Sequence, residues 1–164
     1  MRVRATSLVF GLVVILVSCS GPAPQKTAPA ETKAAAPSHQ PPTDLSTKFP
    51  QAGQTAIKLV PDHLLGKDFM PGGNLADYKT KDGEYQIFLL KAADSQKAAF
   101  ILLDWKTAMP DAKYLAHMGG YYGMDAGKPV YVFSKGPYLA GFVGLIEAKA
   151  DPEARRLAAK LPAQ

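Results

Sequence analysis

The side chains of this 164-residue chain that could do chemistry are few, and they stand apart from one another. His117 and Met118 are adjacent and could in principle bind a soft metal or a haem. Neighbouring residues of a helix point about 100° apart, so the two would not readily hold one ion together. A histidine at a helix end is the simpler interpretation. Because no His-x-x-x-His or Glu-x-x-His motif is present and the chain has one cysteine, no metal site is expected.

Acidic and basic side chains offer one further possibility. Asp62 and His63 are neighbours and could act as an acid and a base, but Pro61 suggests a turn there. If the protein is an enzyme, its acid and base must converge only through the fold. The candidates for that role are His63, His117, Asp104 and Asp125.

Serines and glycines form no recognised catalytic or phosphate-binding motif. Ser95 follows Asp94 at an expected helix start, and Ser134 lies in an expected strand without a Gly-x-Ser-x-Gly pattern. The glycine-rich segment 119–123 precedes a strand and lacks the Lys-Ser or Lys-Thr of a phosphate loop. Catalysis is therefore less favoured than binding, and no cofactor is expected.

Aromatic residues are the candidates for ligand binding, since they supply rigid contact area. The candidate ligand-binding residues are Tyr121, Tyr122, Tyr138 and Phe142. Packing in the core and in hairpins explains them at least as well.

The chain has a single cysteine, Cys19, and it follows an N-terminal targeting segment. A basic start precedes an apolar run at 8–17, and the small Ser18 stands just before the cysteine, as in a secretory signal peptide. The run is shorter than the roughly 20 apolar residues that a spanning helix needs. The sequence Leu-Val-Ser-Cys at 16–19 resembles the lipobox of bacterial lipoproteins. That resemblance implies cleavage after residue 18 and lipid attachment at Cys19.

Such a lipoprotein would be exported and held on a membrane by its acyl chains, since several chains give stable anchoring. Ser20 resembles the residue of lipoproteins sorted to an outer membrane, facing the periplasm where the organism has two membranes. After a signal peptide at 1–18, the segment 19–48 is rich in proline and alanine. Because it has almost no large apolar side chain, we expect a disordered tether.

The charge of the chain does not favour nucleic acid as a partner. There are 19 basic and 14 acidic side chains, and removal of Arg2 and Arg4 with the signal peptide leaves 17 basic ones, a net charge of +3. The lysines are spread along the domain and do not form the basic stripe that phosphate binding requires. A solvated surface explains them.

Residues 49–164 are expected to form one domain, which begins with a hairpin and a helix. Strands are predicted at 75–80 and 84–91, with a turn signal between them. Asp94 and Ser95 offer an N-cap. Apolar residues then recur at helical spacing until Pro110: Ala98, Leu102, Trp105 and Met109.

The second half of the domain alternates strands and helices. A short helix is predicted from Pro110 through His117, followed by strands at 121–124, 129–134 and 138–146. A last helix is predicted to start at Asp151. The fold class is therefore α+β, with one antiparallel sheet of about five or six strands packed with two or three helices.

The last predicted strand is apolar on both faces, although an antiparallel sheet usually keeps one face wet. Its two glycines, Gly141 and Gly144, leave gaps between the large side chains. Helices and loops of the domain, the segment 49–70, a partner subunit or a ligand could cover the second face. Cover by the domain itself is favoured, and a groove there would be the place to look for binding.

Three stretches of the domain resemble an uncharacterised family of exported bacterial proteins. They are the strand and helix at 84–105, the Phe-x-Lys-Gly-x-Tyr hairpin within 132–138, and the Leu-Ala-x-x-Leu-Pro pattern at 157–162. The resemblance implies a single α+β domain and transfers no activity, catalytic residue or cofactor.

Two functions remain open at this point. The first is a non-catalytic binding module of the bacterial envelope, presented on its lipid and tether to an envelope protein, a glycan or a lipid. The second is an envelope enzyme whose acid–base site is assembled only in the fold.

Overall fold

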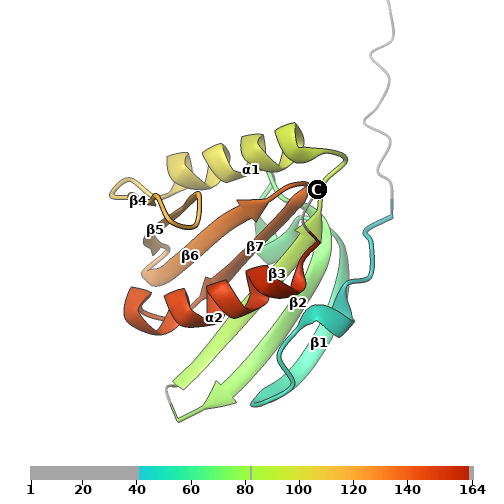
Figure 1. Cartoon of the computed structure of the whole chain (residues 1–164), viewed down its shortest axis with the longest axis vertical. Helices are drawn as coiled ribbons and strands as arrows, with labels where there is room; N and C mark the ends of the chain where they lie inside the picture. The colour runs from blue at the N-terminus through green and yellow to red at the C-terminus, as the bar shows by residue number, and fades with distance from the viewer. Residues whose placement is uncertain (1–40, 82, 163–164) are drawn as a thin grey trace, which may run out of the picture. The chain divides into compact units, whose positions relative to one another are not determined.

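The domain is built on one antiparallel sheet of seven strands, as seen in the computed structural model, which describes residues 41–81 and 83–162 (Figure 1). The strands are β1 (Gln54–Asp62), β2 (Pro71–Thr80), β3 (Gly83–Lys91), β4 (Lys113–Leu115), β5 (Gly120–Asp125), β6 (Lys128–Lys135) and β7 (Tyr138–Val143). Their order across the sheet is β1-β2-β3-β7-β6-β5-β4. The predicted α+β class with one antiparallel sheet is confirmed, with seven strands in place of five or six.

Two long helices cover opposite faces of this sheet. The helices are α1 (Ser95–Ala108) and α2 (Glu147–Lys160), with short 3-10 turns η1 (Ser46–Lys48) and η2 (Leu64–Gly66). Along β3, Phe88 and Leu90 pack in the core with α1, whereas Ile87 and Leu89 pack in the core with α2. The domain therefore has three layers, and its own elements cover both apolar faces, as favoured from the sequence.

The helix α1 forms as its sequence predicts. The Asp94 side chain accepts a hydrogen bond of 2.7 Å from the backbone N–H of Lys97, which satisfies a donor that the first turn leaves free. Ala98, Leu102 and Trp105 form the buried stripe of the helix. The Trp105 indole N–H donates to the Met70 sulfur at 3.1 Å, which links the helix to the segment before β2.

The apolar pattern of the last strand is explained by close packing around a glycine. A Cβ placed on Gly141 would lie 2.4 Å from the ring of Phe88, so that ring occupies the gap which the sequence leaves. Leu139 belongs to the α1 core, whereas Tyr138 and Phe142 belong to the α2 core. The strand ends at Val143, earlier than the predicted residue 146.

The predicted helix from Pro110 through His117 is wrong. Residues 113–115 form the edge strand β4, in which Tyr114 pairs with Tyr121 of β5. Gly119 has φ +60° and closes the turn between these strands, rather than capping a helix. Pairing of the tyrosines across the hairpin outweighs the local helix signal at Pro110.

Two further elements differ from the predictions. The strand β1 was not predicted, because it lies at the sheet edge, contains Pro61 and is largely exposed. The helix α2 begins at Glu147, so the predicted start at Asp151 is wrong. Its first turn is held by the Ile146 carbonyl, which accepts from the N–H groups of Lys149 and Ala150 at 2.9 Å, and Pro152 lies inside the helix.

The packed domain extends slightly beyond its predicted start at residue 49. Leu45 and Phe49 are buried in the core that α2 covers, and the Thr43 carbonyl accepts a 2.9 Å hydrogen bond from Asn74. The end of the predicted tether is therefore part of the folded unit. The predicted signal peptide, the predicted lipid attachment site Cys19 and most of the predicted tether lie outside the described residues.

Candidate functional site

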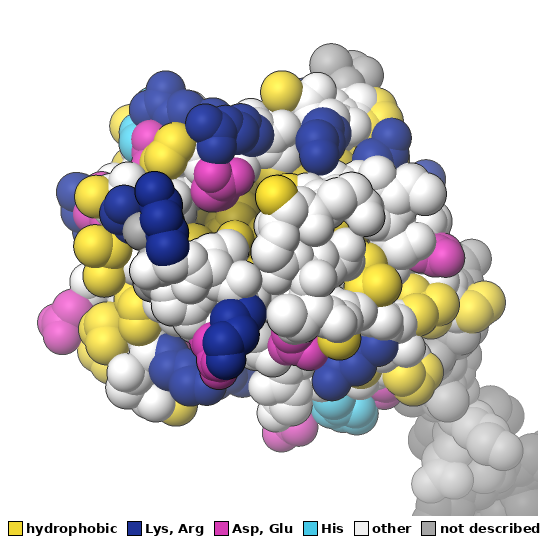
Figure 2. Space-filling view, turned by 90° about the horizontal axis from the view of Figure 1, so that it is seen from below, with side chains coloured by type: hydrophobic (Ala, Val, Ile, Leu, Met, Phe, Trp, Pro, Cys, Tyr) yellow, Lys and Arg dark blue, Asp and Glu magenta, His cyan; other side chains and the backbone are white. Residues whose placement is uncertain are grey.

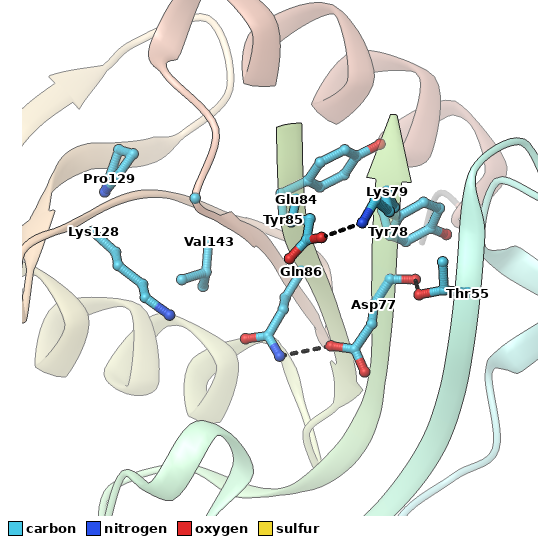
Figure 3. A pocket seen from close by; sticks show the side chains of 11 residues that line it. Thr55, Asp77, Tyr78, Lys79, Glu84, Tyr85, Gln86, Lys128, Pro129 and Val143 are labelled. Atoms are coloured by element: carbon cyan, nitrogen blue, oxygen red, sulfur yellow. Dashed lines mark hydrogen bonds and ion pairs between the residues drawn. The ribbon is translucent and has the colours of Figure 1, made fainter. Parts of the chain in front are cut away.

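A groove of about 580 Å³ lies on the sheet near the β2–β3 turn, and both polar and apolar residues line it. Polar side chains from four strands line it: Thr55 on β1, Asp77 and Lys79 on β2, Glu84 and Gln86 on β3, and Lys128 on β6. Figure 3 shows Asp77 and Gln86 pointing toward each other, with Lys128 on the other side of Val143. Side chains from both halves of the sheet therefore meet at one opening.

Strand alternation explains why this surface is polar. Asp77 lies two residues from Leu75 on β2, and Gln86 lies two residues from Phe88 on β3, so they share the face that α1 packs on. Leu75 and Phe88 are buried in that core, but Asp77 and Gln86 are only partly buried. One face of the sheet is thus apolar in the core with α1 and polar beyond it.

Cross-strand contacts hold the groove in shape. The Gln86 amide donates to the Asp77 carboxylate at 2.7 Å, and the Thr55 hydroxyl donates to the Asp77 carbonyl at 3.1 Å. Lys79 and Glu84 form an exposed ion pair at 2.8 Å, and this hydrogen bond lowers the pKa of Glu84 and raises that of Lys79. A ligand in the groove would meet preset acceptors and donors.

A second candidate site is a shallow pocket of about 410 Å³ at the first turns of α2, lined by His117, Glu147, Ala148, Asp151 and Pro152. The His117 Nε2 lies 2.5 Å from the Asp151 carboxylate. The same carboxylate accepts from the Tyr131 hydroxyl and from Arg155, each at 2.8 Å.

Competing effects set the protonation of this second site. Burial alone would raise the pKa of Asp151, but hydrogen bonds from His117, Tyr131 and Arg155 outweigh burial and hold the pKa at about 2. Burial, together with the hydrogen bond to Asp151, raises the pKa of Tyr131. Asp151 is therefore a carboxylate at neutral pH and orients the His117 ring.

The predicted acid–base residues do not converge. His63 contacts its neighbour Asp62 at 3.2 Å in an exposed position after β1. Asp125 pairs with Lys67 at 2.7 Å in the β5–β6 hairpin. Asp104 is exposed on α1. His117 contacts Asp151, which the sequence analysis treated only as the start of a helix.

The predicted aromatic ligand-binding residues are also not gathered on one surface. Tyr138 and Phe142 are buried in the core that α2 covers. Tyr121 and Tyr122 are half-buried and pack against opposite cores. Sequence reasoning missed the groove residues Asp77 and Gln86. Their only signal was that each is a polar residue two positions from a buried apolar one, on strands that pair with each other.

The surface of the domain carries charges of both signs. On the face seen in Figure 2, Lys and Arg side chains are interspersed with Asp and Glu. Within residues 41–81 and 83–162, no three His, Cys, Asp or Glu side chains are grouped as metal ligands. Over that same part of the chain, none of the helices has the length and apolar character needed to cross a bilayer.

Comparison with known proteins gives a fold and no function. Neither a family model nor a curated protein matches the sequence. A solved structure described as a GTP binding regulator from Thermotoga maritima is similar to this chain, with a TM-score of 0.54 and 16% sequence identity. The likeness covers 74% of this chain and 91% of that chain. At this identity the likeness shows that the two proteins share a fold.

Proposed function

We propose that the protein is an exported bacterial lipoprotein, anchored through Cys19, whose domain binds a hydroxyl-rich glycan of the cell envelope in the sheet groove without catalysing a reaction. The lipobox pattern at 16–19 supports the anchor, and Ser20 supports an outer-membrane location facing the periplasm where two membranes are present. One observation carries the binding role: polar side chains from both halves of the sheet converge on an open groove near the β2–β3 turn.

The chemistry of the groove suits hydroxyl groups. A carboxylate accepts hydrogen bonds, an amide both donates and accepts, and an ammonium donates, so Asp77, Gln86 and Lys128 together offer both kinds of partner. A sugar hydroxyl is itself both donor and acceptor. Lys128 makes no hydrogen bond or ion pair with another described side chain, which leaves its ammonium available to a ligand.

The anchor is tested by acylation. Mass spectrometry of the protein purified from its native host should find acyl chains on an N-terminal Cys19. The Cys19→Ala variant should lose both the acyl chains and the membrane association. An intact precursor, or a cysteine without lipid, would overturn the anchor.

The groove is tested by a binding screen of the mature chain against envelope glycans. The double variant Gln86→Ala/Lys128→Ala should lose about tenfold or more in affinity, as expected for two polar contacts. Lys160→Ala, which removes an exposed lysine from α2, serves as the control.

GTP, which the name of the similar solved structure suggests, is a separate probe. Groove-dependent binding of GTP without glycan binding would replace the proposed ligand.

The second candidate is an envelope enzyme, favoured by the short contact between His117 and Asp151 beside a shallow pocket. Asp151 would orient the His117 ring, and His117 would act as the general base. A hydrolase screen of the wild-type chain and of His117→Asn tests this. Activity lost in the variant, with an unchanged unfolding curve, would favour the enzyme over the binding module.

A further inference from the structure

The outer side of α1 carries an exposed apolar surface that the fold does not use. Phe100 and Leu103 are 50% and 51% exposed and lie three residues apart, so they are neighbours on the helix. They point away from the buried stripe of Ala98, Leu102 and Trp105. The solvent side of the helix therefore carries two large apolar side chains among polar ones.

Lysines and tyrosines continue this surface in both directions. The Lys97 ammonium lies 6.0 Å from the Phe100 ring centroid. On the other side, the Lys106 ammonium lies 5.9 Å from the Tyr121 ring, which is 5.5 Å from the ring of Tyr114. We call this row the α1 patch, and its members are Lys97, Phe100, Leu103, Lys106, Tyr121 and Tyr114.

The patch holds a large share of the exposed apolar side chains. Seven large apolar side chains are exposed among the described residues, and three of them belong to it: Phe100, Leu103 and Tyr114. Apolar side chains flanked by lysines and tyrosines are the composition of surfaces that rest in a membrane interface, where rings sit among headgroups and ammonium groups meet anionic lipid. Asp104 is the one acidic residue on α1, whereas the helix carries two lysines, both in the patch. The side chains of the helix therefore have more positive than negative charge.

We infer that the α1 patch contacts the lipid surface to which the domain is tethered, inserting Phe100 and Leu103 among anionic headgroups. This inference rests on the proposed anchor, because a tether keeps the domain close to a membrane and lets a weak contact be populated. Binding by the patch alone is weak, since only two side chains insert. In the lipidated protein the contact sets which side of the domain faces the membrane.

The test uses the full mature chain with Cys19→Ala, so that binding by the domain is not masked by acyl chains. Flotation with vesicles of phosphatidylethanolamine and phosphatidylglycerol should carry the protein, and phosphatidylcholine vesicles should carry less. The variant Phe100→Ser/Leu103→Ser should reduce the partition coefficient about tenfold or more. Replacement of Lys97 and Lys106 by glutamine should remove the salt-sensitive part of the binding.

The matched control is Met124→Ser/Ile146→Ser, which removes two apolar side chains of 50% and 59% exposure outside the patch. It should partition as the parent chain does, and urea unfolding checks that both double variants stay folded. Because the contact is weak, the vesicles are supplied in large excess. Failure of the parent chain to bind anionic vesicles under that excess, or equal loss in both double variants, overturns the inference. Acylation of Cys19 is measured separately on the wild-type protein. If Cys19 is acylated but the Cys19→Ala chain does not bind vesicles, the inference about the patch is overturned and the proposed anchor stands.

Discussion

Asp151 shows how a single residue gains its properties from the fold. Its carboxylate receives His117 from the β4–β5 turn, Tyr131 from β6 and Arg155 from its own helix. Burial opposes its charge, and the three donors together reverse that effect and depress the pKa to about 2. Asp151 is thus a link between α2 and the strands below it, whichever function the pocket has.

The depressed pKa predicts a dependence of stability on pH. A carboxyl group with a lowered pKa in the folded state stabilises the fold above its unfolded pKa and loses that effect as pH falls through the folded value. A shift from 3.8 to about 2 corresponds to about 2 kcal/mol, and we expect about 1 kcal/mol because solvent screens this partly exposed group. The contribution should be complete above about pH 5 and vanish near pH 2.

Urea unfolding of wild type and Asp151→Asn at several pH values measures this contribution. The difference in unfolding free energy should shrink as the pH falls from about 5 to 2. Asp104→Asn, on the exposed side of α1, is the control and should show little effect at any pH. A difference that stays constant with pH would contradict the assigned role of the Asp151 charge.

Gly141 is a second residue whose identity is explained only by its neighbours. A methyl group there would lie 2.4 Å from the Phe88 ring and 2.6 Å from the Tyr131 carbonyl oxygen. We therefore predict that Gly141→Ala lowers the unfolding free energy by about 1–3 kcal/mol through overpacking. Thermal and urea unfolding measure the loss, and the double variant Gly141→Ala/Phe88→Leu should recover part of it. Additive losses in the double variant would show that the ring is not the obstacle.

At the scale of elements, α1 is the one whose beginning and end the sequence defines best. Its buried stripe, its N-cap and the proline after it agree with one another, so local signals and packing point to the same helix. The cap is made by Asp94, whose side chain bonds the N–H of Lys97, while Ser95 is the first helical residue.

This assignment predicts different effects at two adjacent residues. Asp94→Ala should cost about 1 kcal/mol of unfolding free energy, because the N–H of Lys97 loses its partner. Ser95→Ala should change it by less than about 0.5 kcal/mol. Chemical unfolding of the two variants measures both changes. A larger loss of unfolding free energy in Ser95→Ala would identify Ser95 as the N-cap instead of Asp94.

The elements that the sequence did not predict correctly are those held by pairing across the sheet. The strand β4 is three residues long, and its Tyr114 is positioned by pairing with Tyr121 in the next strand. The strand β1 is an exposed edge whose register comes from β2, with a shift between Gln54 and Ala56. Local propensity carries little of this information, because strand formation depends on the partner strand.

At the scale of the whole molecule, the domain boundary has a measurable consequence. Leu45 and Phe49 are buried, and the Tyr78 hydroxyl donates to the Pro50 carbonyl at 2.7 Å. A chain that starts at residue 41 should unfold as the mature chain does. A chain that starts at residue 51 should lose about 3–5 kcal/mol or fail to fold, because it lacks a buried phenylalanine and a leucine. Equal stability of the two truncated chains would place the boundary later.

The candidate sites could be predicted only in part. His117 attracted attention from its type alone, but its partner Asp151 is far away in the sequence and meets it through the packing of α2 on the sheet. Asp77 and Gln86 come from two predicted strands, and their contact follows from the register of that hairpin. Lys128 reaches the same groove only because β7 lies between β3 and β6 in the sheet.

The sequence by itself determined the α+β class, the central hairpin and the helix α1, because local spacing and capping suffice for each of them. The tertiary structure decided the number of strands, the burial of Tyr138 and Phe142, the groove and the cluster around Asp151. Those features depend on contacts between residues distant in the chain, and a long-range contact forms only when both partners are positioned by the whole sheet.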